Sequence, residues 1–106
     1  MVKNIMNQAL LDKEIKDDIH VVVDFWASFC NPCRMLEPVF EEAARELEGK
    51  AKFIKMNIFD HEEVSRRFQI TTVPAVFIFK NGEVIDKSVG FKPKEVMIKW
   101  IEENLI

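Results

Sequence analysis

The chain has 106 residues, of which 48% are hydrophobic and 31% are charged, and its formal net charge is −3. This is enough apolar material for one core, so we expect a single domain over residues 1–106. The balance argues against nucleic-acid binding, which needs a basic excess or stripe. No segment reaches the roughly 20 apolar residues of a membrane span, and the N-terminus lacks the apolar stretch of a signal peptide. We therefore expect a cytoplasmic protein whose thiols stay reduced.

The expected elements alternate between helix and strand along the first half of the chain. Residues 7–17 are a helix candidate, and a short strand near residues 2–6 can precede it. Residues 20–27, HVVVDFWA, form a nearly continuous apolar run, which is typical of a strand covered on both faces. In residues 32–49 the apolar positions recur every three or four residues, which predicts an amphipathic helix that contains Pro38.

The second half of the chain has three further strand candidates, at residues 52–59, 75–79 and 83–90. Residues 60–68 predict a short helix with Asp60 as its N-cap, and Pro93 marks the first residue of a last helix. The strand–helix–strand order predicts parallel pairing, whereas Asn81-Gly82 predicts an antiparallel hairpin. We therefore expect an α/β fold with a mixed central β-sheet, parallel in its first half and antiparallel in its second, flanked by helices.

The two cysteines, Cys30 and Cys33, stand together in the stretch WASFCNPCR, where the buried strand meets the following helix. The first turn of a helix has unpaired N–H groups with partial positive charge, which lower the pKa of a nearby thiol. Cys30 would then attack a disulfide in another protein, and Cys33 would resolve the mixed disulfide. Pro32 stiffens the small ring and suits the first helical turn.

A C-x-x-C pair can instead be half of a zinc site, which needs four ligands. The other candidate ligands are His20 and His61, which lie 41 residues apart without a ligand-like spacing. His20 opens a strand and His61 opens a helix. We therefore expect both to be surface histidines, and we expect no bound metal.

Two residues outside the pair favour redox chemistry. Asp24 interrupts the apolar run, and a carboxyl buried there would have a raised pKa and accept the proton of Cys33. The alternative is an exposed strand position. Pro74 precedes an apolar strand. It is either a loop proline or a cis proline that turns a strip of backbone toward a ligand.

The segments VVVDFWASFCNPCR, VPAVFIFKNGEV and VGF occur in this order, and from about His20 to the C-terminus the chain resembles the thioredoxin family. The resemblance implies the thioredoxin fold and a protein disulfide reductase. In that activity, the reduced cysteine pair converts a disulfide of a protein substrate into two thiols. It also implies that electrons come from a separate donor of the thioredoxin-reductase type. The sequence has no Gly-rich phosphate loop, so we expect no cofactor, and we expect a monomer.

The same resemblance assigns roles to individual positions. Cys30 matches the nucleophile, Cys33 the resolving cysteine and Asp24 the buried acid, and Lys55 matches the lysine placed near that acid. For Lys55 the alternative is an exposed strand lysine, and for Gly90 a strand-ending turn. The positions expected to contact substrate are Trp26, Phe29, Asn31, Pro32, Val73, Pro74 and Gly90.

The chain departs from the usual W-C-G-P-C motif of the family at Phe29 and Asn31. Phe29 stands where the usual motif has tryptophan, so it keeps an apolar side chain beside the cysteines but lacks the indole N–H donor. The Asn31 amide either bonds to the Cys30 sulfur or caps the helix, which would stabilise the thiolate, or it faces solvent and changes little. Thr71-Thr72 replaces a charged-and-glycine pair, which bears on substrate choice.

Two alternative functions remain at this point. A disulfide oxidase or isomerase would differ in reduction potential, where about 30 mV corresponds to about 1.4 kcal/mol. A binding module that retains the fold as a scaffold would not need both thiols.

Overall fold

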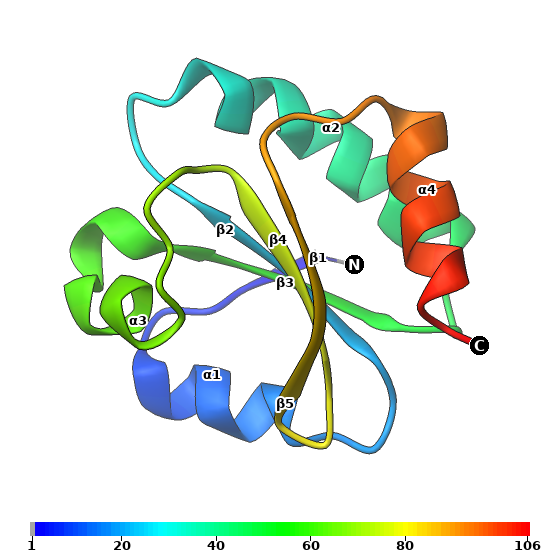
Figure 1. The fold of residues 1–106 in the computed structure, drawn as a ribbon, viewed down its shortest axis with the longest axis horizontal. Helices are drawn as coiled ribbons and strands as arrows, with labels where there is room; N and C mark the ends of the chain where they lie inside the picture. The colour runs from blue at the N-terminus through cyan, green and yellow to red at the C-terminus, as the bar shows by residue number, and fades with distance from the viewer. Residues whose placement is uncertain (1) are drawn as a thin grey trace.

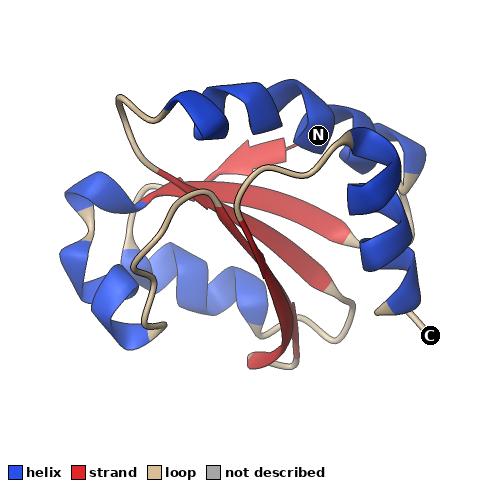
Figure 2. Cartoon of the chain, turned by 45° about the horizontal axis from the view of Figure 1, so that its top comes forward, coloured by secondary structure: helices blue, strands red, loops and turns tan. Residues whose placement is uncertain are grey.

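The computed structural model describes residues 2–106. It contains one mixed sheet with helices on both faces (Figures 1 and 2). The strands are β1 (Val2–Asn4), β2 (Val21–Trp26), β3 (Lys52–Asn57), β4 (Ala75–Lys80) and β5 (Glu83–Val89). The helices are α1 (Gln8–Ile15), α2 (Asn31–Glu46), α3 (Glu62–Arg67) and α4 (Lys94–Glu103), with a short 3-10 helix, η1 (Ile58–Asp60), before α3.

The strand order is β1-β3-β2-β4-β5. β3 pairs in parallel with β1 and with β2, whereas β4 runs antiparallel to β2 and to β5. The expected mixed sheet, with a parallel part followed by an antiparallel hairpin, is therefore confirmed. At the hairpin, Asn81 and Gly82 have φ angles of 53° and 83°, the left-handed pair that a two-residue turn with the twist of the strands requires.

Side chains of β2 alternate between two apolar cores because successive strand residues point to opposite faces. Val21, Val23 and Phe25 pack with α1 and α3, whereas Val22 packs with α2 and α4. Figure 1 shows these helix pairs on opposite sides of the sheet. Asp24 follows the same alternation as Val22, and its side chain therefore faces α2.

Helix α2 has an apolar stripe against the sheet, made by Leu36, Phe40, Ala43 and Ala44, and Cys33 extends this stripe to the first turn of the helix. The 3.6-residue period of the sequence predicts this stripe correctly. Pro38 lies inside the helix, as expected.

Two predicted helix starts were wrong. Asp60 ends η1 and does not cap α3, because a 3-10 turn follows β3 directly and leaves His61 in the capping position. Pro93 is extended, with ψ at 163°, and it is the N-cap of α4, so that Lys94 is the first helical residue. Both differences lie outside the junction of β2 and α2, where the cysteines are.

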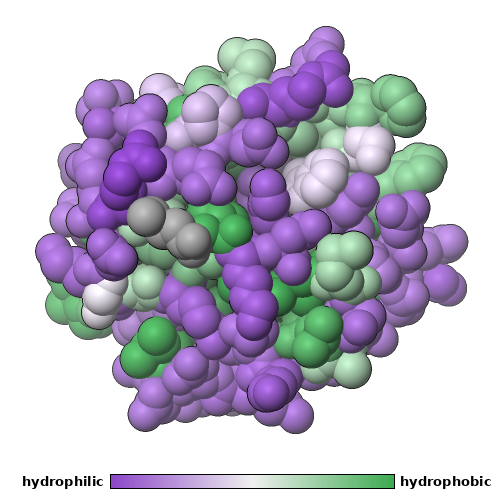
Figure 3. All heavy atoms as spheres, turned by 180° about the vertical axis from the view of Figure 1, so that it is seen from behind, coloured by the Kyte–Doolittle hydropathy of each residue, from purple (hydrophilic) through white to green (hydrophobic). Residues whose placement is uncertain are grey.

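Figure 3 shows the molecule from behind, where hydrophilic residues cover most of the surface and hydrophobic residues form separate small patches. Among the helices described over residues 2–106, none is long and apolar enough to cross a membrane.

Candidate active site

Cys30 stands at the N-terminus of α2 as its capping residue. Its Sγ atom accepts a hydrogen bond from the backbone N–H of Cys33, with a sulfur–nitrogen distance of 3.2 Å. The two cysteines form a disulfide with their Cα atoms 5.2 Å apart. Cys30 is half-buried, whereas the side chain of Cys33 is buried against the sheet. Cys30 is therefore the more accessible of the two cysteines.

The residue before the pair projects into solvent. Phe29 is 93% exposed and has a φ of 61°, a left-handed conformation that turns the chain from β2 toward α2. A fully exposed phenylalanine next to a reactive sulfur offers apolar area to a docking partner. This position agrees with the expectation of an apolar rim.

A second loop meets the cysteine pair from the other side. The Val73–Pro74 peptide bond is cis, as one of the two interpretations of Pro74 predicted. The carbonyl oxygen of Val73 lies 3.9 Å from the Sγ atom of Cys30. The N–H of Gly90 donates a 2.8 Å hydrogen bond to the carbonyl oxygen of Pro74. Val73 thus lies next to Cys30, and Gly90 is joined to the adjacent Pro74.

Asp24 is buried in the central strand β2, with 3% of its surface exposed. Its Oδ1 atom has no hydrogen-bond partner among residues 2–106. Burial raises the pKa of the Asp24 carboxyl to about 7, the positive charge of Lys55 opposes this rise, and the negative charge of Glu37 adds to it. The expectation of a buried acid is confirmed, and near neutral pH this acid can both take up and release a proton.

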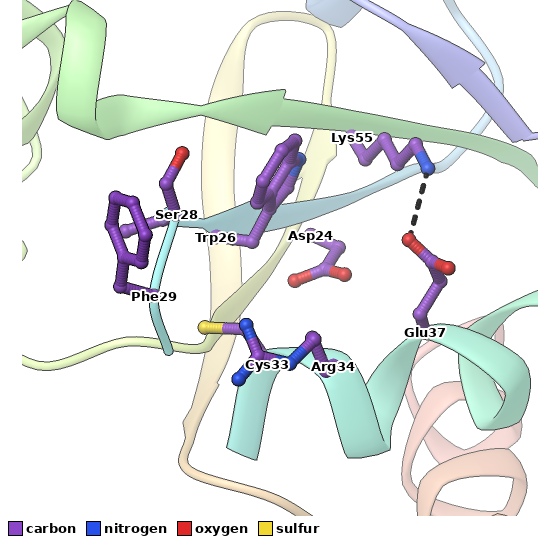
Figure 4. A pocket seen from close by; sticks show the side chains of 9 residues that line it. Asp24, Trp26, Ser28, Phe29, Cys33, Arg34, Glu37 and Lys55 are labelled. Carbon is purple, nitrogen blue, oxygen red and sulfur yellow. Dashed lines mark hydrogen bonds and ion pairs between the residues drawn. The ribbon is translucent and has the colours of Figure 1, made fainter. Parts of the chain in front are cut away.

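A cavity of about 250 Å³ separates this acid from the helix (Figure 4). Asp24 and Cys33 both line it, together with Trp26 and Lys55. A water molecule needs only about 10–15 Å³ of such space, so the cavity has room for water between the carboxyl and the buried sulfur. A proton can pass between the two groups without a direct contact.

The charges at the far side of the cavity come from β3 and α2. Lys55 lies beside Asp24 in the sheet register, and its Nζ atom is 3.5 Å from Oε2 of Glu37. Figure 4 shows the ammonium group directed toward Glu37. Lys55 thus lies near the buried acid, as the resemblance implied. Glu37 is not among the site residues expected from the sequence, although its position one helical turn after Cys33 places it on the same side of α2.

Asn31 and Pro32 begin helix α2. The Oδ1 atom of Asn31 accepts a hydrogen bond from the guanidinium of Arg34, and the cap is made by Cys30 itself. In the disulfide form, the Asn31 side chain therefore neither bonds to the Cys30 sulfur nor caps the helix. Trp26 lines the cavity, and its buried Nε1 atom has no partner among residues 2–106.

His20 and His61 are both partly exposed. Among residues 2–106, no cluster of three or more His, Cys, Asp or Glu side chains is arranged to hold a metal ion.

Comparison with known proteins agrees with this geometry. The family model described as Thioredoxin matches residues 2–103. The chain belongs to the thioredoxin family. It is 42% identical to the thioredoxin of Rickettsia bellii over 99% of this chain and the whole of that protein. It is 39% identical to the thioredoxin of Staphylococcus saprophyticus over 89% of each chain.

Solved thioredoxins have the same fold. The structure of Malassezia sympodialis thioredoxin gives a TM-score of 0.90 at 30% identity, covering 99% of this chain and 94% of that one. The structure of Plasmodium falciparum thioredoxin gives a TM-score of 0.89 at 32% identity, covering 96% of this chain and 98% of that one. With its C-x-x-C disulfide, this member of the thioredoxin family is a thiol–disulfide oxidoreductase that serves as a protein disulfide reductase. Membership of the thioredoxin family implies protein disulfides as substrates and a reductase as electron donor.

Proposed function

We propose that Cys30 is the nucleophile of the disulfide reductase, that Cys33 is its resolving cysteine, and that Asp24 takes the proton of Cys33. The difference in access to the two sulfurs supports these roles. Cys30 is half-buried at the start of α2, and Cys33 is buried above the cavity that Asp24 lines.

The first step begins with the reduced pair. The Cys30 thiolate attacks one sulfur of a substrate disulfide, the substrate S–S bond breaks, and a mixed disulfide forms. The leaving thiolate of the substrate takes a proton from solvent. A thiolate at a helix N-terminus is stabilised by the unpaired N–H groups there, and the Cys33 N–H already points at this sulfur.

The second step releases the substrate. The Cys33 thiol gives its proton to the ionised Asp24 carboxyl through the cavity, and its sulfur attacks Cys30. The mixed disulfide breaks, the second substrate thiolate leaves and is protonated, and the Cys30–Cys33 disulfide remains. Two electrons have passed from the pair to the substrate. An acid with a pKa of about 7 is well matched to this transfer at neutral pH.

The substrate segment would lie across the face that surrounds Cys30. Phe29 offers apolar area, and the backbone of Val73 offers hydrogen-bonding groups next to the sulfur. Gly90 lies at the edge of the same face, bonded to Pro74. Trp26, Asn31 and Pro32 complete the proposed contact residues, and Lys55 belongs to the proton-transfer group through its place beside Asp24.

We propose one domain over residues 1–106 that works as a monomer in the cytoplasm, where a separate reductase of the thioredoxin-reductase type restores the dithiol. The negative net charge, and the small size of the apolar patches on the face drawn in Figure 3, support a protein without nucleic-acid or membrane partners.

Two serine variants test the roles of the cysteines. Cys33→Ser should accumulate mixed disulfides with substrate proteins through Cys30, because attack is retained and release is lost. Cys30→Ser should form none and should not reduce a protein disulfide. The adducts are counted by non-reducing electrophoresis and mass spectrometry after incubation with an oxidised protein substrate. Adducts that form with Cys30→Ser rather than with Cys33→Ser would reverse the assignment.

A further inference from the structure

The proton-accepting role of Asp24 leaves open what keeps this acid from pairing with its closest cation. Lys55 occupies the neighbouring position in the parallel pair β2–β3, and neighbouring strands lie about 4.8 Å apart. Yet the ion pairs among residues 2–106 join Lys55 to Glu37, and none joins Lys55 to Asp24. The Oδ1 atom of Asp24 remains without a partner.

Glu37 reaches Lys55 from the other wall of the cavity. Its carboxylate projects from α2, and Figure 4 shows the Lys55 ammonium lying toward Glu37 instead of the Asp24 carboxyl. The side chain of Glu37 is 66% exposed and that of Lys55 is 22% exposed, so the pair lies at the mouth of the cavity, at its solvent side. Glu37 therefore holds the ammonium group at the mouth, where water also solvates it.

We propose that Glu37 is a positioning residue of the reductase: by pairing with Lys55 it keeps the ammonium group out of contact with Asp24, and so favours the protonated acid at neutral pH. This inference rests on the proposed proton transfer from Cys33 to Asp24. Without the Glu37 carboxylate, Lys55 would be free to turn inward and pair with the buried carboxylate, which would hold Asp24 ionised and weaken its affinity for the proton of Cys33.

The other groups around Asp24 do not substitute for this contact. β4 places the apolar Val76 beside it. From α2 the cavity receives Arg34 and Cys33 in addition to Glu37. Arg34 is bonded to Asn31 at the helix start, and Cys33 is in the disulfide.

The direct test is the titration of Asp24 itself. The carbon resonance of its carboxyl is followed by NMR against pH in the oxidised protein without substrate. Glu37→Gln should lower the pKa of Asp24. We expect the proton affinity of Asp24 to fall about two- to fivefold, a change of the size that exposed ion pairs typically contribute. An unchanged or raised pKa of Asp24 would overturn the inference.

Glu41→Gln is the matched control. It removes the same charge from the same helix one turn further on, and Glu41 neither lines the cavity nor forms an ion pair among residues 2–106. It should leave the titration of Asp24 where it is in the wild type. A shift equal to that of Glu37→Gln would show that any negative charge on α2 has this effect, and would overturn the positioning role.

A second background separates positioning from simple repulsion between the two carboxylates. In Lys55→Met, no ammonium group remains to be held, so adding Glu37→Gln should shift the Asp24 titration by less than it does in the wild type. An equal shift in both backgrounds would overturn the inference. The pH dependence of substrate release should move to lower pH in Glu37→Gln, in step with the titration.

These readouts separate the two claims. The NMR titration needs no turnover, so a failure of Glu37→Gln to move Asp24 would refute the role of Glu37 while the trapping result for Cys33→Ser stands. A failure of the trapping experiment would refute the proposed exchange and leave the titration unaffected.

Discussion

The backbone N–H of Cys33 donates a hydrogen bond to the Sγ atom of Cys30 over 3.2 Å, so the sulfur of the first cysteine caps the helix whose first turn contains the second. Hydrogen bonds to a charged acceptor are shorter and stronger than those to a neutral one. The same contact therefore favours the thiolate once the disulfide is reduced. The spacing of two residues between the cysteines serves both the small ring and this cap.

Asp24→Asn should stabilise the oxidised protein in a pH-dependent way. The pKa of Asp24 is raised from 3.8 to about 7, so between these values the unfolded chain loses a proton that the folded chain keeps. The stability that the wild type has below pH 4 is therefore lost as the pH rises to about 7. Each tenfold change in proton affinity is about 1.4 kcal/mol, which makes the loss about 4 kcal/mol at most.

Urea unfolding of Asp24→Asn and wild type checks this at pH 4 and at pH 8. We expect the variant to gain stability at pH 8 and to gain much less at pH 4. It should also release reduced substrate more slowly at neutral pH, because the proton acceptor is gone. Equal stability differences at both pH values, together with wild-type turnover, would mean that Asp24 does not titrate in this range.

Asn31→Ala should leave the pKa of the Cys30 thiol close to that of the wild type. The Asn31 amide bonds to Arg34 and not to sulfur, so removing it takes no hydrogen bond from the thiolate. Loss of a charge-assisted hydrogen bond would change the potential by about 30–65 mV, from about 1.5–3 kcal/mol. Alkylation of Cys30 against pH and a glutathione equilibrium measure both quantities. A change of potential in that range would show that the amide turns to the sulfur on reduction.

Gly90→Ala should lose stability and also impair substrate reduction. Gly90 has a φ of 91°, and a left-handed conformation costs an alanine about 1–2 kcal/mol. Gly49→Ala is a suitable control because Gly49 has a φ of 83° and open space around its Cα, away from the cysteines. Both variants should shift the urea midpoint by a similar amount. We expect Gly90→Ala alone to raise KM for a protein disulfide, because backbone strain at Gly90 would displace the loop that its N–H joins to Pro74. Equal KM values would remove Gly90 from the proposed substrate face.

Much of the fold and the centre of the site could be predicted from sequence because their signals are local. The apolar run around Asp24 predicts a central strand, and the change of period after Cys30 predicts the helix start. Each conclusion depends on one continuous segment. The N-cap of α3 was predicted wrongly. An aspartate just before a helix is a typical N-cap, but Asp60 is the last residue of the 3-10 helix η1, and His61 takes the capping position.

The proposed role of Glu37 depends on contacts between segments that are far apart in the sequence. The register of β3 must place Lys55 beside Asp24, and the rotation of α2 must bring Glu37 over the same cavity. Neither relation has a periodic signal, since both are set by packing between elements. The contact of Asn31, in contrast, lies within one segment. Arg34 follows three residues later on the same helix, a spacing at which side chains are neighbours, and it bonds to the Asn31 side chain in place of the Cys30 sulfur.

The strand order also divides the molecule by how readily its parts open. β2 has a hydrogen-bonded strand on each side, whereas β5 has a neighbour on one side. Backbone amides of a doubly paired central strand exchange with solvent when the whole sheet unfolds, and those of an edge strand exchange through local opening. The buried acid Asp24 therefore belongs to a strand whose amides we expect to exchange slowly, and Gly90 follows the edge strand. Local opening near Gly90 would therefore leave the strand that holds Asp24 in place.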